Sequence, residues 1–365
     1  MKLLYITNGI SGAGGLERVL SVKASYFAEK LNYEVHILTL NEKNNSQFFP
    51  FSSKIKIHDI SLKKIFLSYI YSYTTKIKKL VNEIKPDIIL VCDDGLKGFF
   101  LPIFLGKPCP MIYERHVSKI IELRENSNWL LRIAIQFKWK MMNILAANFD
   151  RFVVLTEGNK KEWPLKNLIV IPNPLSFYPK TRANLISKKV IAVGKQSYQK
   201  GYDLLLEAWK QVIIEYPDWN LEIYGTFDSS QQLEMLSKQL QLESTVHFHL
   251  PVQDIEKHYL ESSIFVLSSR FEGFAMVLIE AMSCGVPCIS FDCPYGPGDI
   301  ITDGTDGLLV ENGDIQGLAN SIIKLIKTPL LRKKMGENSR NSVIKYYPDT
   351  ICNQWDILFN SLLIK

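Results

Sequence analysis

The fold is decided by the stretch Arg270-Phe-Glu-Gly-Phe-Ala-Met-Val-Leu-Ile-Glu280-Ala-Met-Ser-Cys-Gly285-Val-Pro287. Short apolar runs of strand type lie on either side of it, at residues 264–269 and 288–291. Between them, residues 275–284 have the apolar character of a buried helix, which Gly285 can end in a left-handed turn. The stretch therefore predicts a strand–loop–helix–strand unit.

The chemistry of this unit begins with a helix that we expect to open directly after Glu272 and Gly273. Exposed N–H groups and partial positive charge make a helix N-terminus a ready site for a phosphate. Glu272 and Glu280 would lie about 12 Å apart along a helix, too far for a two-carboxylate glycosidase site. We expect them to contact different parts of one long ligand. Glu280 stands among apolar residues and needs a partner, for which ligand hydroxyls are one candidate, and an ordinary salt-bridged or partly exposed glutamate is the alternative.

The stretch resembles the E-x7-E motif of retaining glycosyltransferases of family 4, which have the GT-B fold. The resemblance implies transfer of a sugar from a nucleotide-sugar donor, with Glu280 holding the nucleotide ribose and Glu272 beside the sugar. The loop after Glu272 would contact the donor sugar and phosphate. Ala275 stands where the family usually has glycine. The implied donor-binding residues of this stretch are Gly273, Phe274, Ala275, Met276, Val277 and Glu280.

A second loop carries the charge that a diphosphate requires. A strand at residues 190–193 runs into a loop with Lys195, Lys200 and flanking glycines, and a helix follows. Cations and glycines between a strand and a helix can pair the leaving charge and let the backbone approach it. The family has Arg where Lys195 stands, and Lys200 fits its pattern. A solvated basic loop is the alternative.

Two further turns resemble donor-binding loops of the family. Gly14 and Gly15 follow the first strand and resemble the glycine-rich loop that faces the donor diphosphate, although a plain tight turn is the alternative. The glycines do not complete G-x-G-x-x-G, and this argues against an NAD-dependent oxidoreductase. The turn at Pro251 and Val252 would lie beside the base.

His116 ends another predicted strand, at the edge where α/β sheets bind ligands. The family commonly has a similar Glu-His pattern at this place, which implies that His116 contacts the donor sugar or an acceptor hydroxyl. A structural histidine is the alternative. No residue stands out as the enzyme nucleophile.

The 365 residues are enough for two domains. We predict an α/β protein of the GT-B type, with two Rossmann-like doubly wound domains facing a cleft. Residues 1–174 form the acceptor-side domain, on which a C-terminal helix at 350–365 packs back, and residues 175–349 form the nucleotide-sugar domain. A Pro-Asn-Pro sequence at 172–174 begins the linker.

Charge and hydropathy limit the partners. Residues 1–175 contain 25 basic and 15 acidic residues, whereas the remainder contains 18 and 22. The basic, partly apolar helices predicted within residues 61–85 and 128–147 are candidate anionic membrane or acceptor surfaces, with packing on the sheet as the alternative. The sequence contains no long apolar span and no nucleic-acid motif. We expect a cytoplasmic protein, with a peripheral position on the inner face of the plasma membrane as a further prediction.

The function predicted is retaining transfer of a hexose or N-acetylhexosamine from a nucleotide sugar to a glycan or lipid-linked glycan acceptor in surface polysaccharide synthesis. We favour a UDP-sugar donor and expect no cofactor and no metal, since no Asp-x-Asp cluster is present and the six cysteines match no zinc spacing. His116, Lys195, Lys200 and Glu272 would perform the chemistry. A GT-B sugar-nucleotide epimerase and a non-catalytic nucleotide-sugar-binding partner are the alternatives.

Overall fold

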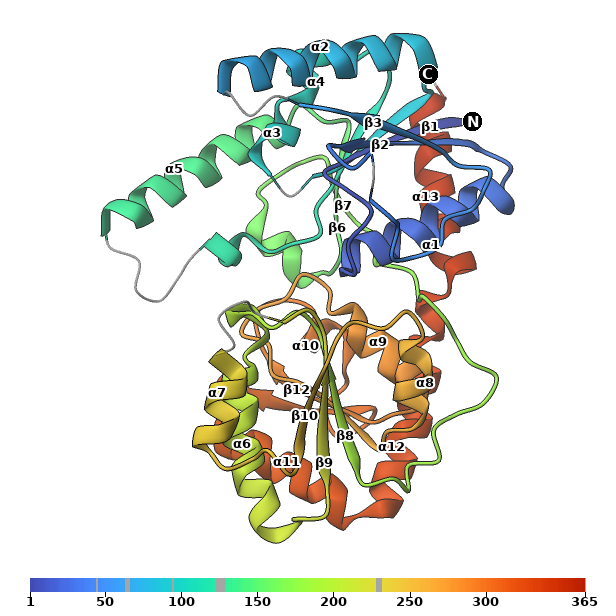
Figure 1. Cartoon of the computed structure of the whole chain (residues 1–365). Coiled ribbons are helices and arrows are strands. Elements are labelled where there is room, and N and C mark those ends of the chain that lie inside the picture. Colours follow the sequence, from blue (N-terminus) through green and yellow to red (C-terminus); the bar gives the residue numbers. More distant parts are fainter. Residues whose placement is uncertain (44, 63–65, 94, 123–128, 228–231, 365) are drawn as a thin grey trace. The chain divides into compact units, whose positions relative to one another are not determined.

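The computed structural model describes residues 1–365 except 44, 63–65, 94, 123–128, 228–231 and 365. The chain divides into two compact units, unit 1 with Met1–Pro174 and Pro348–Lys365 and unit 2 with Leu175–Tyr347. Each unit has its own parallel sheet with helices on both faces (Figure 1). The predicted class, two doubly wound Rossmann-like domains of the GT-B type, is confirmed.

Unit 1 is built around a sheet of seven strands in the order β3-β2-β1-β4-β5-β6-β7. Its strands are β1 (Lys2–Thr7), β2 (Glu34–Leu40), β3 (Lys56–Ile60), β4 (Ile88–Cys92), β5 (Met111–Glu114), β6 (Arg151–Val154) and β7 (Leu168–Val170). Its helices are α1 (Gly15–Glu29), α2 (Phe66–Ile84), α3 (Leu96–Phe99), α4 (Leu101–Leu105), η1 (Lys119–Glu122), α5 (Trp129–Ala146), η2 (Gly158–Glu162) and α13 (Pro348–Leu363).

The central strands of unit 1, such as β1 and β4, are almost continuously apolar and buried because helices cover both faces of a parallel sheet. Tyr73 and Ile77 of α2 are buried in a core cluster that also holds Ile89 and Val91 of β4. The apolar side of α2 is therefore used in packing, and its lysines form an exposed edge. This is the packing alternative for residues 61–85, of which 63–65 lie outside the described residues.

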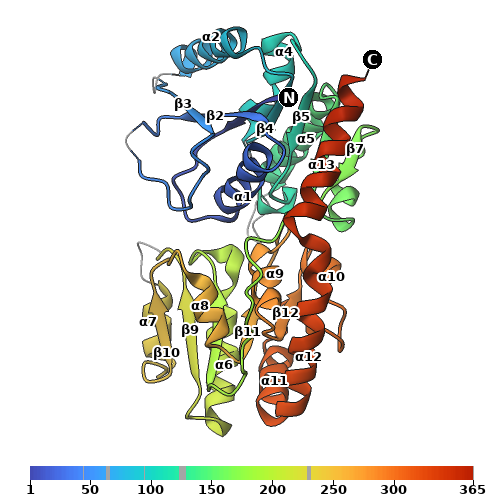
Figure 2. The ribbon, with the colours of Figure 1, turned by 90° about the vertical axis from the view of Figure 1, so that its right-hand side faces the viewer.

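The C-terminal helix α13 belongs to unit 1 and packs on α1 (Figures 1 and 2). The rings of Phe27 and Phe359 lie 5.4 Å apart, and the Tyr26 hydroxyl donates to Asp349 at 2.7 Å. The last helix thus ties the end of the chain to the first domain.

Unit 2 contains a six-stranded sheet in the order β10-β9-β8-β11-β12-β13. Its strands are β8 (Lys189–Val193), β9 (Asn220–Tyr224), β10 (Val246–His249), β11 (Ile264–Leu267), β12 (Cys288–Asp292) and β13 (Gly307–Glu311). Its helices are η3 (Tyr198–Lys200), α6 (Tyr202–Glu215), α7 (Gln232–Gln239), α8 (Ile255–Leu260), α9 (Met276–Ser283), α10 (Pro297–Ile300), α11 (Ile315–Lys327), α12 (Pro329–Ser342) and η4 (Val343–Tyr346).

Strand order reverses between β1 and β4 in unit 1 and between β8 and β11 in unit 2. Open α/β sheets bind ligands outside the carboxyl ends of the strands at such a switch point. The topology therefore directs attention to the loops that follow these four strands. None of the helices formed by the described residues combines the length and apolar character that crossing a bilayer requires.

Candidate active site

In unit 2, Lys200 and Glu272 meet at the switch point. Lys200 lies in the loop after β8 and Glu272 in the loop after β11. The Lys200 Nζ donates to Glu272 Oε1 at 2.7 Å, and Ser269 Oγ donates to the same oxygen at 2.6 Å. The structure thus brings together two residues that the sequence analysis singled out separately.

Glycines let these loops approach each other. A Cβ added at Gly201, where φ is +59°, would lie 2.1 Å from the backbone oxygen of Ser268. A Cβ at Gly225, which follows β9, would lie 1.9 Å from the oxygen of Gly194. No side chain fits at either place, so the glycines are required by the close contact of the loops after β8, β9 and β11.

Arg270 fixes the same loops through charge. Its guanidinium donates to both oxygens of Asp203 at 2.8 and 2.6 Å, and its backbone N–H donates to the oxygen of Gln199 at 2.8 Å. Burial alone would raise the pKa of Asp203, but the hydrogen bonds and charge of Arg270 hold that pKa below its usual value. The bidentate pair and the backbone hydrogen bond fix the loop after β11 to the segment that carries Lys200.

Helix α9 runs from Met276 to Ser283, within the predicted residues 275–284, but it begins three residues after Gly273 rather than directly after it. Ala275 precedes the helix in a left-handed conformation with φ +55°. The chain must turn sharply there, and this delays the helix. The family's glycine at this position has a physical reason, since Ala pays about 1–2 kcal/mol in a left-handed backbone.

Glu280 lies on α9 and is 2% exposed. Its Oε1 accepts from Ser176 Oγ at 2.8 Å, and its Oε2 accepts from the Tyr259 hydroxyl at 3.5 Å. Hydroxyl groups therefore hold this carboxylate in place. It is not the partly exposed glutamate that the sequence left open as an alternative.

The remaining predicted residues of unit 2 lie in the loops after β8 and β10 and at the start of α9. Lys195 is exposed, and within the described part of the chain its ammonium makes no hydrogen bond or ion pair. Pro251 and Val252 are half-buried in the turn after β10. The segment that leads into α9 and forms its first turn is buried, except that Val277 is half-buried. Its members are Gly273, Phe274, Ala275, Met276 and Val277.

In unit 1, the predicted glycine loop leads into α1. Gly14 caps the helix and Gly15 is its first residue. A Cβ at Gly12 or Gly14 would lie 2.5 or 2.6 Å from the Glu17 carboxylate. Glu17 thus folds back against the loop, where a carboxylate is favoured by the helix N-terminus.

His116 follows β5 and lies beside a buried ion pair. The Lys23 ammonium lies against both carboxylate oxygens of Glu114, and each of the two side chains is 1% exposed. His116 Nε2 lies 3.4 Å from Glu114 Oε1. Burial alone would raise the pKa of Glu114, but Lys23 and His116 hold that pKa well below its usual range.

Cys92, Glu114 and His116 place possible metal-ligand atoms within 4.8 Å of one another. A metal ion here would lie next to the Lys23 ammonium, which already neutralises the carboxylate. Repulsion between two cations in a buried place is strong, so the site fits a metal poorly.

At the switch point of unit 1, a contact between Asn8 and Asp93 was not predicted from the sequence. Asn8 lies directly after β1, and Asp93 lies directly after β4. The Asn8 side chain donates to Asp93 Oδ1 at 2.9 Å. Asp93 is 1% exposed. The available signal was that each residue immediately follows an apolar strand of a parallel sheet.

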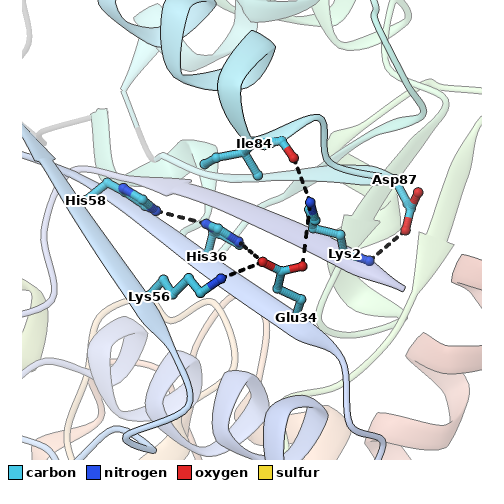
Figure 3. A network of polar contacts seen from close by, with 7 residues as sticks. All are labelled: Lys2, Glu34, His36, Lys56, His58, Ile84 and Asp87. Carbon is cyan, nitrogen blue, oxygen red and sulfur yellow. Dashed lines mark hydrogen bonds and ion pairs between the residues drawn. The ribbon is translucent and has the colours of Figure 1, made fainter.

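A further polar cluster lies at the other end of the unit 1 sheet (Figure 3). His36 Nδ1 and His58 Nε2 lie 2.9 Å apart, and His36 Nε2 lies 3.1 Å from Glu34 Oε1. Lys56 donates to Glu34 at 2.6 Å. Lys2, Glu34 and Lys56 begin their strands, so the cluster is at the amino edge and separate from both switch points.

Comparison with known proteins identifies the family of the chain. The family model described as Glycosyl transferases group 1 matches residues 178–342, and the model Glycosyl transferase 4-like matches residues 15–149. An uncharacterized glycosyltransferase of Haemophilus influenzae is 31% identical over 97% of this chain and 98% of its own length. The chain belongs to the group 1 glycosyltransferase family.

Other relatives are named for specific pathways. The amylovoran biosynthesis glycosyltransferase AmsD of Erwinia amylovora is 28% identical over 98% of this chain and 99% of its own. The lipopolysaccharide 1,6-galactosyltransferase of Escherichia coli is 27% identical over 89% of each chain. A crystal structure of a mutant of S. aureus TarM in complex with Fondaparinux, alpha-GlcNAc-glycerol and UDP has the same fold. It aligns with a TM-score of 0.82 and 17% identity, over 98% of this chain and 99% of its own.

Proposed function

We propose that the chain is a retaining glycosyltransferase that moves a hexose or N-acetylhexosamine from a UDP-sugar to a glycan or lipid-linked glycan of a surface polysaccharide. The observation that carries the proposal is the Lys200–Glu272 pair at the switch point of unit 2. The names of the E. coli relative and of the TarM complex support the acceptor class and the nucleotide.

The pair would work by exchange of partners. Lys200 is 15% exposed and its carboxylate partner 7%, so a ligand can reach the ammonium. A diphosphate offers more negative charge than one carboxylate and would draw Lys200 from Glu272. Glu272, still bonded to Ser269, would then face the donor sugar. Exposed Lys195 and the backbone around α9 would add to the positive field.

The leaving diphosphate gains charge as the bond to the sugar breaks. A cation that is held in place before reaction stabilises this charge more than the charge of the intact donor, and this difference accelerates the reaction. We therefore assign Lys200 to turnover. Glu280 would accept from the ribose hydroxyls, as it now accepts from Ser176 and Tyr259, and would contribute to binding.

We extend the proposal to residues of unit 1 and to the reaction's requirements. Gly14, Gly15 and His116 would contact the donor or the acceptor hydroxyl, and Pro251 and Val252 of unit 2 the base. We propose that transfer requires no metal, so excess EDTA should leave the rate unchanged. The cytoplasmic location remains a prediction.

The test is a thermal-shift screen of the whole chain with UDP, GDP, CDP and ADP and with their common sugars, followed by transfer assays on lipopolysaccharide-core and lipid-linked acceptors. We expect stabilisation by UDP and by one UDP-sugar, and a product whose anomeric configuration matches the donor. An inverted product would refute retention. An isomerised sugar nucleotide formed without acceptor would indicate an epimerase, and donor binding without transfer or hydrolysis a non-catalytic partner.

A further inference from the structure

Helix α5 of unit 1 is apolar on two faces, and only one face is packed. Ile135, Met142, Leu145 and Ala146 form the packed face. Exposed large apolar side chains gather on the rest of the helix. Six of those described in the chain lie on α5, and no other described helix has more than two. They are Trp129, Leu130, Leu131, Ile133, Phe137 and Ile144.

Four of these side chains form a line. Trp129, Ile133, Phe137 and Ile144 are spaced by four, four and seven residues, which puts them on one side of an α-helix over about 22 Å. Trp129 is 68% and Phe137 70% exposed. We call these four residues the α5 stripe. An exposed apolar surface of this length indicates an interaction site.

The charges on α5 identify the kind of partner. The helix contains three basic residues and no acidic one. Lys140 falls within the α5 stripe by its spacing from Phe137 and Ile144, and it is exposed. A second copy of α5 would cover this ammonium with apolar side chains and could supply no carboxylate to pair with it. An anionic lipid surface supplies phosphates at the level where a lysine reaches out of the apolar layer.

We propose that the α5 stripe docks unit 1 on an anionic membrane, with α5 lying in the plane of the interface. Such a helix inserts its apolar side at the boundary of headgroups and acyl chains, where Trp is favoured. Each basic residue near an anionic surface strengthens binding roughly fivefold. Helix α2 contributes its lysine edge at most, because its apolar face is used in the core.

This proposal is independent of the proposed donor site, to which α5 contributes no residue. Flotation of the full chain with vesicles tests it, with phosphatidylglycerol mixed into phosphatidylcholine in one set and phosphatidylcholine alone in the other. We expect binding to the anionic set only. The double variant Ile133→Ser, Phe137→Ser should lower partitioning about tenfold to a hundredfold. Lys140→Glu should weaken vesicle binding roughly 25-fold, because it removes one positive charge and adds one negative charge, and each of these changes weakens binding roughly fivefold.

The matched control is the double variant Ile214→Ser, Leu330→Ser, which removes two apolar side chains of unit 2 that are even more exposed than Ile133 and Phe137. It should bind vesicles like the unchanged chain. All variants should keep the thermal shift with UDP, which separates failure of docking from failure of the donor site. A blue shift of fluorescence on anionic vesicles should shrink in Trp129→Phe.

Three results would overturn the proposal. One is unchanged flotation of Ile133→Ser, Phe137→Ser. Another is equal binding to neutral and anionic vesicles. In the third, the unchanged chain forms a dimer and does not bind vesicles, and the variant Ile133→Ser, Phe137→Ser is a monomer. The α5 stripe would then be an interface between two copies.

Discussion

Two lysine–glutamate pairs, one in each unit, differ chiefly in how far water reaches them. In unit 2, Lys200 and Glu272 are 15% and 7% exposed. In unit 1, Lys23 and Glu114 are each 1% exposed, and the Lys23 ammonium also lies 4.2 Å from the ring centre of Trp355. Both pairs lie on the carboxyl side of a parallel sheet.

Burial determines whether the lysine of such a pair can leave its glutamate and bind a ligand instead. Lys23 cannot leave Glu114 without stranding a carboxylate in the core, which costs several kcal/mol. That pair therefore holds α1, β5 and α13 together. Lys200 can leave Glu272, because Ser269 and water still satisfy the carboxylate, so that pair can open for a ligand.

The largest effect is expected from breaking the buried pair. Glu114→Ala would leave the Lys23 ammonium buried without its counter-charge, and the free energy of unfolding should fall by about 3–5 kcal/mol. Urea unfolding of the full chain measures this. The double variant Lys23→Met, Glu114→Leu should recover most of the loss. A Glu114→Ala chain as stable as the parent would mean that the pair has no structural role.

The pair of Lys200 and Glu272 should behave in the opposite way, with a large effect on catalysis and a small effect on stability. Lys200→Ala should reduce kcat about 100-fold to 1000-fold, the size of effect seen when one donor to a developing charge is removed. Its unfolding free energy should change by about 1 kcal/mol or less, because Lys200 is partly exposed and Ser269 still donates to the Glu272 carboxylate. Lys189→Ala, at the amino edge of the same sheet, is the control and should leave kcat unchanged. Equal kcat values for Lys200→Ala and the parent would contradict the assignment.

The next effect concerns the nucleotide. Glu280→Ala removes a charged acceptor of ligand hydroxyls, and the Kd for UDP should rise about tenfold to a hundredfold, from a loss of about 1.5–3 kcal/mol. Calorimetric titration measures it. Tyr259→Phe removes one hydroxyl that holds Glu280 and should have a smaller effect in the same direction. An unchanged Kd in Glu280→Ala would remove this residue from the site.

The amino edge of unit 1 should make stability depend on pH. Burial lowers the pKa of His36 and of His58, and the charge of His36 lowers that of His58 further. Because the pKa values of these histidines in the folded chain lie below the unfolded value of about 6.5, the histidines take up protons when the chain unfolds. Their stabilisation is therefore present above about pH 6.5 and is lost as the pH falls below it.

Neighbouring charges modify this dependence. Lys56 and Lys2 also disfavour protonated His36, whereas Glu34 favours it, and Glu83 favours protonated His58. Hydrogen bonds from Lys56 and His36 lower the pKa of Glu34 to about 2, so its contribution is lost only at lower pH. His58→Gln should flatten the slope of unfolding free energy between about pH 7 and 5. Identical slopes in both chains would show that the pair does not titrate as described.

The smallest effect is expected at the start of α9. Ala275→Gly relieves a left-handed alanine but adds freedom to the unfolded chain, so stability should rise by about 0.5–1 kcal/mol. A rise in Tm would show this. Ala281→Gly, inside the same helix, should lower stability by at least about 1 kcal/mol. A loss of stability in Ala275→Gly would contradict the strain at that position.

The sequence was sufficient for the strand, helix and strand at residues 264–291, which are β11, α9 and β12, because the apolar runs and glycine turns there are local signals. Gly285, for instance, has the predicted left-handed conformation, with φ +76°. Local signals also placed Lys200 and Glu272 on the correct loops. They could not show that the two side chains pair, because that contact depends on the meeting of β8 and β11, which are far apart in sequence.

The buried pair of unit 1 was missed for the same reason. Lys23 and Glu114 are 91 residues apart. One signal was present, since Lys23 falls on the same side of α1 as buried Val19, Leu20 and Phe27. A lysine on an apolar helix face needs a counter-charge, but only the folded sheet identifies which carboxylate supplies it.

The proposed function depends above all on Lys200, which we expect to bind the diphosphate of the leaving nucleotide. The most direct test is a double comparison of UDP with UMP, and of the unchanged chain with Lys200→Ala, by calorimetric titration. We predict that the unchanged chain binds UDP about tenfold or more tightly than UMP and that Lys200→Ala loses most of this ratio, whereas Glu280→Ala weakens both ligands equally. A Lys200→Ala chain that keeps the full preference for UDP would contradict the account.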